Sequence, residues 1–240
     1  RKSFHWMNRN VSTMKQMNPM KQTSQSSRSS RPSQSSRLIA LDGDGVLLDY
    51  ATAYGAAWER AFGDKPTLVN PHAYWPMDRW GVPRLSGQAL EQFRSVFDET
   101  FWRTIPAVDG AVEACEQLVR AGYDLICVTA LDARHLDARR HNLCELGFPL
   151  SHVYATDSVP TSSGASPKAA VLNDLLPACF VDDYAPYLMG VDERIHRVLI
   201  TRDPDGSPNT GNMLEWADAC FPDLRAFVSH QLADGRKDLA

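Results

Sequence analysis

The chain has 240 residues, of which 43% are hydrophobic and 22% charged, and its mean hydropathy is -0.34. These values predict a soluble globular protein with a hydrophobic core, and no apolar run approaches the roughly 18 residues that a membrane-spanning helix needs. The five cysteines form no Cys-x-x-Cys pair, which argues against a disulfide scaffold or a thiolate zinc site and favours a reducing compartment such as the cytoplasm.

Charge is divided unevenly along the chain. Residues 1–37 hold eight of the 25 Lys and Arg residues and no Asp or Glu, so the remainder carries 17 basic and 29 acidic side chains. A body this acidic argues against a nucleic-acid-binding surface on the fold itself.

Residues 1–37 are predicted to form a disordered basic tail. Residues 22–37 are almost all Ser, Gln, Arg and Pro, too few of them apolar to offset the entropy of an ordered chain. Three roles stay open: an unstructured or untranslated leader whose true start is not fixed, an Arg- and Ser-rich organelle transit peptide, and a basic arm that contacts nucleic acid.

The first predicted strand covers residues 38–41, an apolar run that ends in Asp-Gly-Asp-Gly, as expected for a strand buried on both faces. Further strands are predicted at 124–129, 153–155, 178–181 and 198–200, the last of them. Helices are predicted after a cap at Asp109, over 132–146, and after a cap at Ser166, with Pro167 in the first turn. This alternation predicts an α/β fold, a doubly wound parallel sheet with helices on both faces.

The pattern changes between Val46 and Pro106, where no convincing strand is present. Residues 56–62 have a helical pattern, and four later apolar side chains lie on one helical stripe: Leu90, Phe93, Phe97 and Phe101. We predict a helical cap over residues 47–106, inserted after the first strand into a body formed by residues 38–46 and 107–240. Trp75 and Trp80 offer a stacking surface to a substrate, although packing within the cap accounts for them equally well.

Chemically useful side chains follow the predicted strands at their carboxyl ends, where open α/β sheets bind ligands, and Lys168 lies at the start of the helix before the strand at 178–181. Six of them share this edge: Asp42, Asp44, Thr129, Lys168, Asp182 and Asp183. Four converging acids would repel one another unless a hard divalent cation neutralises them, and oxygen ligands favour Mg²⁺. A lysine and a hydroxyl beside such a cation are what a phosphoryl group needs.

Asp42 and Asp44 are two residues apart, and phosphoryl transfer can use two carboxyl groups with different roles. One carboxylate can attack phosphorus and form an aspartyl phosphate, while its neighbour protonates the leaving oxygen and then activates water. Other phosphate-binding classes fit less well: Leu48 occupies the third glycine position of a dinucleotide-binding GxGxxG, and the chain has no GxxxxGK[ST].

In this order the six residues resemble the motifs of the haloacid dehalogenase (HAD) superfamily of phosphatases, and the resemblance covers nearly all of residues 38–200. It implies a Rossmann-like core with a small helical cap. It implies that Asp42 is the nucleophile and a Mg²⁺ ligand, and that Asp44 is the general acid/base and gives a backbone carbonyl to the metal. Thr129 and Lys168 would hold the phosphoryl oxygens.

By the same resemblance, Asp182 would bind Mg²⁺, and Asp183 would bind it directly or through water. The implied function is Mg²⁺-dependent hydrolysis of a small phosphorylated metabolite, with the oligomeric state left open. Three alternatives remain: a 5'(3')-nucleotidase-like enzyme, favoured by similarity of Val-Asp-Asp and Phe101-Trp102 to the deoxyribonucleotidase branch; a sugar phosphomutase; and a catalytically silent regulatory or binding member.

Overall fold

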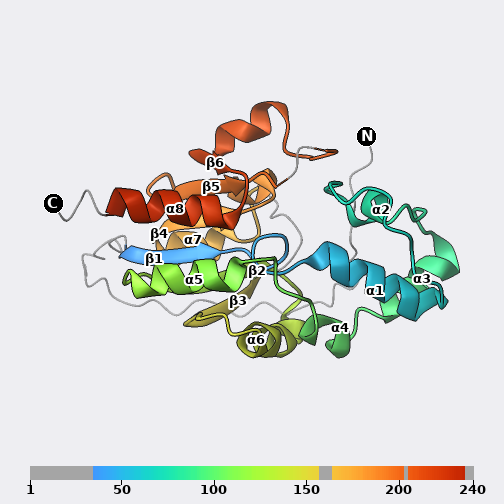
Figure 1. Ribbon diagram of the computed structural model, residues 1–240. Helices are drawn as coiled ribbons and strands as arrows, with labels where there is room; N and C mark the ends of the chain where they lie inside the picture. The colour runs from blue at the N-terminus through green and yellow to red at the C-terminus, as the bar shows by residue number, and fades with distance from the viewer. Residues whose placement is uncertain (1–34, 157–163, 203–204, 236–240) are drawn as a thin grey trace, which may run out of the picture.

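The computed structural model describes residues 35–156, 164–202 and 205–235. Within them six strands form one sheet in which all neighbouring strands run parallel, in the order β3-β2-β1-β4-β5-β6 (Figure 1). The strands are β1 (Ser35–Leu41), β2 (Asp124–Ala130), β3 (His152–Thr156), β4 (Pro177–Asp182), β5 (His196–Ile200) and β6 (Ala219–Phe221). The predicted α/β fold is confirmed, while most of the predicted tail lies outside the described residues.

Side chains of the central strands alternate between two core layers. In β1, Ile39 and Leu41 pack in one layer and Ala40 in the other, and all three are fully buried. The same alternation continues in β2, β4 and β5. Because both faces of the sheet are covered, the strands are continuously apolar in sequence.

Helices cover both faces of the sheet (Figure 1). Helices α5 (Ala111–Arg120) and α8 (Leu224–Gly235) pack on each other over one layer, to which α6 (Leu136–Glu145) also contributes. Helix α7 (Ala169–Leu175) and the 3₁₀ turn η2 (Ala185–Leu188) cover the other layer. Two further 3₁₀ turns are η1 (Ala133–His135), before α6, and η3 (Gly211–Trp216), before β6.

Two local predictions, about the last strand and the cap of α5, are wrong. The strand at 198–200 is not the last, because β6 follows it; β6 has only three residues, too few for a hydrophobic pattern. Asp109 does not cap α5: the N-cap is Gly110, whose φ of 72° is left-handed, and the Asp109 carboxylate pairs with Arg225 instead.

Between β1 and α5 the chain forms four helices that lie beyond the carboxyl end of β1 (Figure 1): α1 (Tyr50–Phe62), α2 (Pro76–Arg79), α3 (Gly87–Ser95) and α4 (Glu99–Arg103). Their core is aromatic, with ring centroids 4.9 Å apart for Tyr54 and Phe93 and 4.5 Å apart for Phe97 and Phe101. The predicted stripe is divided between α3 and α4, because Asp98 caps a new helix by accepting a hydrogen bond from the Phe101 amide.

Among the described helices, none combines the length and the apolar character needed to cross a bilayer.

Candidate active site

The candidate site lies where the sheet reverses its order of connection. β1 has β2 on one side and β4 on the other. The connections that follow β1 and β4 therefore turn to opposite sides, which opens a crevice at the carboxyl ends of these strands. Asp42 directly follows β1, and its amide donates to Val181 O of β4 at 2.9 Å. Asp182 ends β4, so the topology brings the first and last acidic motifs of the sequence together.

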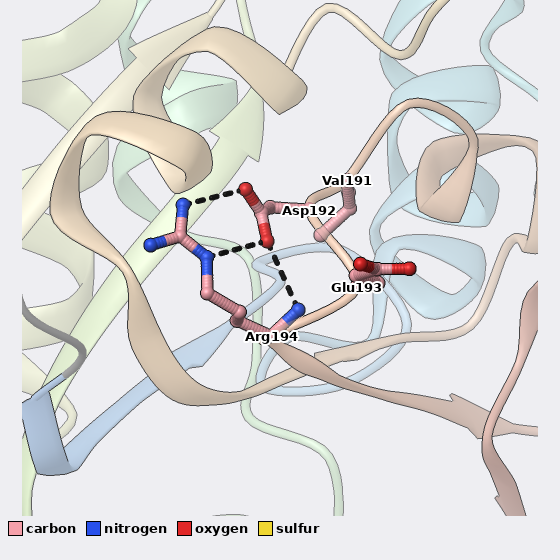
Figure 2. A pocket seen from close by; sticks show the side chains of 4 residues that line it. All are labelled: Val191, Asp192, Glu193 and Arg194. Atoms are coloured by element: carbon pink, nitrogen blue, oxygen red, sulfur yellow. Dashed lines mark hydrogen bonds and ion pairs between the residues drawn. The ribbon is translucent and has the colours of Figure 1, made fainter. Parts of the chain in front are cut away.

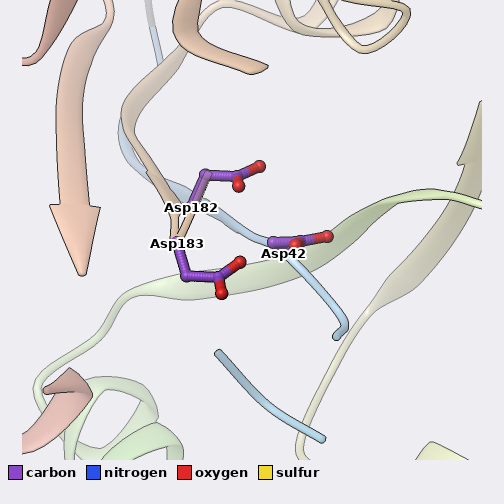
Figure 3. A group of neighbouring side chains, drawn as sticks. All are labelled: Asp42, Asp182 and Asp183. Carbon is purple, nitrogen blue, oxygen red and sulfur yellow. The ribbon is translucent and has the colours of Figure 1, made fainter. Parts of the chain in front are cut away.

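Three carboxylates meet in this crevice: those of Asp42, Asp182 and Asp183 (Figure 3). One oxygen from each lies within 4.8 Å of the other two, and the residues are 4%, 0% and 4% exposed. Burial raises the pKa of both Asp42 and Asp182. It also raises the pKa of Asp183, to about 6. An all-oxygen donor set of this size fits a hard divalent cation, which would remove the repulsion between the carboxylates.

Lys168 connects two of these acids. Its Nζ lies 2.6 Å from Asp42 Oδ1 and 2.6 Å from Asp182 Oδ2, and its side chain is fully buried. Burial opposes the charge on Lys168, but Asp182 and Asp42 outweigh it and raise the pKa of the ammonium above its usual range. Lys168 is therefore a charged group inside the crevice.

The backbone before α7 positions Lys168 differently from the prediction. Lys168 itself is the N-cap, and the predicted cap, Ser166, accepts a hydrogen bond from the Lys168 amide at 3.1 Å. The ammonium lies 4.4 Å from the centroid of the Tyr187 ring, within reach of a cation–π contact.

Two glycines shape the loop that carries Asp42 and Asp44. A Cβ on Gly43 would lie 2.9 Å from Thr129 Oγ1 and 3.1 Å from an Arg139 nitrogen, so a side chain there would push these two groups away from the loop. Gly45 has a left-handed φ of 94°, and a Cβ there would collide with the Asp183 carboxylate. Thr129, at the end of β2, is 1% exposed and faces the same loop.

The Asp44 carboxylate binds Arg139 of α6, a residue that the sequence patterns did not single out. Both terminal nitrogens of Arg139 donate to it, at 2.7 and 2.9 Å. Arg139 is fully buried, while the Asp44 side chain is 26% exposed. The contribution of the Asp44 backbone carbonyl to a metal site stays a prediction.

A second cation that sequence reasoning missed, Arg202, follows β5 at the same edge of the sheet. Its guanidinium pairs with the Asp183 carboxylate and lies 4.7 Å from the centroid of the Tyr74 ring. The Asp183 carbonyl oxygen accepts hydrogen bonds from the Tyr74 hydroxyl at 3.3 Å and from Asn209 Nδ2 at 2.8 Å. Tyr74 thus joins the segment between α1 and α2 to the acidic cluster.

A cavity of about 330 Å³ lies beside the acidic cluster. Its charged and hydroxyl lining comes from the sheet edge and the residues that follow it: Asp42, Asp44, Thr129, Asp183 and Arg202. Its aromatic lining comes from both sides of the crevice: Tyr50, Tyr74, Trp75, Tyr184 and Tyr187. Trp80, also considered from the sequence, instead packs within the helical segment, where its indole donates to Ala51 O at 2.6 Å.

Another hollow, of about 580 Å³, lies at the turn formed by residues 191–194, before β5 and therefore at the amino end of that strand (Figure 2). The Asp192 carboxylate accepts hydrogen bonds from the amide, Nε and a terminal nitrogen of Arg194. This hollow holds none of the six predicted site residues.

The chain superposes over most of its length on several solved structures. A HAD-superfamily hydrolase of subfamily IA from Geobacter sulfurreducens matches with a TM-score of 0.53 and 18% identity, covering 81% of this chain and 95% of that one. A protein provisionally named β-phosphoglucomutase, from Thermotoga maritima, matches with a TM-score of 0.52 and 18% identity, covering 82% and 99%. The chain has the haloacid dehalogenase fold. At this identity the likeness establishes the HAD fold alone.

Sequence comparison gives a narrower match. A protein from Bordetella pertussis, provisionally named 5'(3')-deoxyribonucleotidase, is 34% identical over 96 residues, which are 39% of this chain and 50% of that protein. The match thus spans only half the length of this relative. No family model matches the chain.

The HAD fold brings all six predicted site residues to one crevice. Asp42, Lys168 and Asp182 are in direct contact, and Asp183 joins them through the acidic cluster. Asp44 and Thr129 line the same cavity. The catalytic role of each residue stays a prediction.

Proposed function

We propose that this chain is a Mg²⁺-dependent phosphatase that hydrolyses a small phosphate monoester through an aspartyl phosphate on Asp42. The observation that carries the proposal is the setting of Asp42, buried at the carboxyl end of β1 with Oδ1 2.6 Å from Lys168 Nζ. The Gly43 amide donates to the same oxygen at 2.6 Å. Oδ2 is then the oxygen that would attack phosphorus.

Asp42, Asp182 and Asp183 would hold the metal ion. Their buried oxygens form a donor set suited to Mg²⁺, and Lys168 is shared between two of them. When bound, Mg²⁺ would neutralise charge on the phosphoryl oxygens and orient the phosphoryl group.

In the first half of the reaction, Asp42 Oδ2 bonds to phosphorus while the bond from phosphorus to the ester oxygen breaks. Asp44 gives its proton to that oxygen, and the alcohol leaves. Thr129 and Lys168 bind the phosphoryl oxygens during the transfer, since both lie beside the loop that carries the nucleophile.

In the second half, a water oxygen bonds to phosphorus as the bond from phosphorus to Asp42 breaks. Asp44 takes the proton from the water, and inorganic phosphate leaves. Residues between α1 and α2, among them Tyr74 and Trp75, line the cavity together with the carboxylates and would limit the access of bulk water.

A nucleoside monophosphate is the second candidate substrate. The aromatic lining of the cavity supports it, because any of the nucleobases can stack on an aromatic ring. The name of the Bordetella relative points the same way. Burial raises the pKa of Tyr50 and Tyr74, so their hydroxyls stay neutral hydrogen-bond donors.

Phosphate release from a panel of sugar phosphates, phosphorylated acids and nucleoside monophosphates, with Mg²⁺ or EDTA, tests the proposal. We expect release only with Mg²⁺, and none from a folded Asp42→Asn variant. Asp64→Asn, which changes an exposed aspartate, is the matched control and should keep full activity.

Three results would count against the proposal. Activity retained in Asp42→Asn would refute the nucleophile, and transfer of phosphate to a second hydroxyl without release would indicate a mutase. No turnover of any ester would favour a silent regulatory protein.

A further inference from the structure

We propose that Arg139 is a positioning residue that fixes the direction of the Asp44 carboxylate for proton transfer. The inference rests on the proposed function, because it assigns a role within the same site. It starts from an ion pair whose two members differ in exposure: Arg139 is fully buried, and the Asp44 side chain is 26% exposed and lines the cavity.

The contact is bidentate, with distances of 2.7 and 2.9 Å from the two terminal nitrogens of Arg139 to the two oxygens of Asp44. Two parallel hydrogen bonds from a planar guanidinium fix the rotation of a carboxylate, which one bond from a lysine would not. Each carboxylate oxygen has a second lone pair. Asp44 can therefore exchange a proton with a group in the cavity while Arg139 holds it.

Other elements hold Arg139 in turn. The Trp102 ring of α4 lies 5.4 Å from its guanidinium carbon, and Gly43 leaves room for a terminal nitrogen on the other side. Three residues further along α6, Asn142 Nδ2 donates a hydrogen bond to Ile105 O at 2.9 Å. This bond fixes the helix to the segment that follows α4. The guanidinium is thus packed before any substrate arrives.

Helix stability alone does not account for a buried arginine at this position. Within the described residues, Arg139 Nε has no hydrogen-bond partner, and the ion pair with Asp44 is the contact that satisfies the other two nitrogens. Burying a charge is unfavourable, and an apolar side chain of similar volume would fill such a site at least as well. The orientation of Asp44 supplies the reason for an arginine here.

Asp44 needs this orientation twice in the proposed reaction. It gives a proton to the ester oxygen as that bond to phosphorus breaks, and it takes a proton from water as the bond from phosphorus to Asp42 breaks. General acid–base catalysis contributes about 10²–10⁴-fold, so partial loss of alignment in Arg139→Met should reduce turnover of an alkyl phosphate by about 10- to 100-fold.

The test compares an alkyl phosphate that the enzyme hydrolyses with 2,4-dinitrophenyl phosphate, whose leaving group needs no proton. For Arg139→Met we expect the loss in kcat on the alkyl ester with little change in KM. With the dinitrophenyl ester, formation of the phosphoenzyme should stay near the wild-type rate while its hydrolysis slows, so the phosphoenzyme accumulates in quench-flow experiments. Arg139→Lys should fall between wild type and Arg139→Met.

Two comparisons separate positioning from a structural role. Asp44→Asn combined with Arg139→Met should be no slower than Asp44→Asn alone, because both changes remove the same function. Arg140→Met is the matched control, since Arg140 is the adjacent, exposed arginine of α6, and it should leave turnover unchanged.

An additive double variant, or equal losses in both half-reactions with the dinitrophenyl ester, would overturn the role of Arg139 and leave the proposed function intact. If Arg139→Met does not fold, as judged by circular dichroism, the same comparisons in Arg139→Lys decide. A wild-type protein that hydrolyses neither ester would overturn the proposed function, and the inference with it.

Discussion

Replacing Lys168 by Met tests whether one ammonium keeps two buried carboxylates charged. Met retains most of the aliphatic length of Lys and removes the charge. Nζ lies 2.6 Å from an oxygen of Asp42 and 2.6 Å from an oxygen of Asp182, and none of the three side chains is more than 6% exposed. The variant therefore leaves two carboxylates in a dry site without the cation between them.

The expected loss is large because the remaining charges stay desolvated. Removing one partner of a buried ion pair destabilises a protein by about 3–5 kcal/mol. For a chain of this size, 1 kcal/mol corresponds to roughly 2–4 °C in the unfolding midpoint, so Lys168→Met should unfold about 6–20 °C lower in EDTA. Mg²⁺ should recover part of this loss, because a bound cation would replace the missing positive charge.

Urea unfolding followed by circular dichroism in EDTA measures the change in free energy. Lys65→Met is the matched control, since Lys65 is the other lysine among the described residues and is exposed. Lys168→Met combined with Asp182→Asn should lose less than the sum of the single variants, because the second change removes an unpaired carboxylate. A loss below about 1 kcal/mol, the value typical of exposed pairs, would refute the buried charge cluster.

Three further predictions concern the same crevice. In EDTA, burial raises the pKa of Asp183 from 3.8 to about 6, so the stability that this group contributes is complete below about pH 4 and is lost as the pH rises through 6. Urea unfolding across this range should show the loss, and Asp183→Asn should remove this pH dependence. Gly45→Ala should destabilise the protein by more than the roughly 1–2 kcal/mol that left-handed backbone strain costs an alanine. The loss should also exceed that of Gly63→Ala, because Gly63 has a positive φ but no neighbour within 4 Å of a new Cβ. Equal losses in the two variants would show that the contact with Asp183 does not matter. Trp75→Ala should raise KM for a nucleoside monophosphate more than for a small sugar phosphate, and an equal change for both would argue against stacking of a base on this side chain.

The main strands and the acidic motifs beside them follow from local patterns in the sequence. Apolar runs mark β1, β2 and β4, and the residues directly after them are Asp42, the Thr129 region and Asp182. Because parallel strands end at a common edge, their proximity needs no knowledge of side-chain packing. The same rule applied to β5 points to Arg202, which follows that strand by two residues.

Arg139 is harder to predict because its helix has no clear apolar face. The buried positions of α6 are Ala138, Arg139, Asn142 and Leu143, so half of the inward stripe is polar. Hydrophobic periodicity cannot distinguish such a stripe from a solvated one. Tyr74 is equally hidden, since it lies in the irregular segment between α1 and α2, and only the tertiary fold brings it to Asp183.

The balance of charge in the crevice explains why a cation would have to precede an anionic substrate. Four carboxylates lie there: Asp42, Asp44, Asp182 and Asp183. Three cations pair with them: Arg139, Lys168 and Arg202. With all four carboxylates ionised, one formal negative charge is left over, and it would repel the dianion of a phosphate monoester. A divalent cation among the buried carboxylates would make the balance positive by one, so the same dianion would be attracted. The basic side chains thus bring the site close enough to neutrality for a single metal ion to reverse its sign.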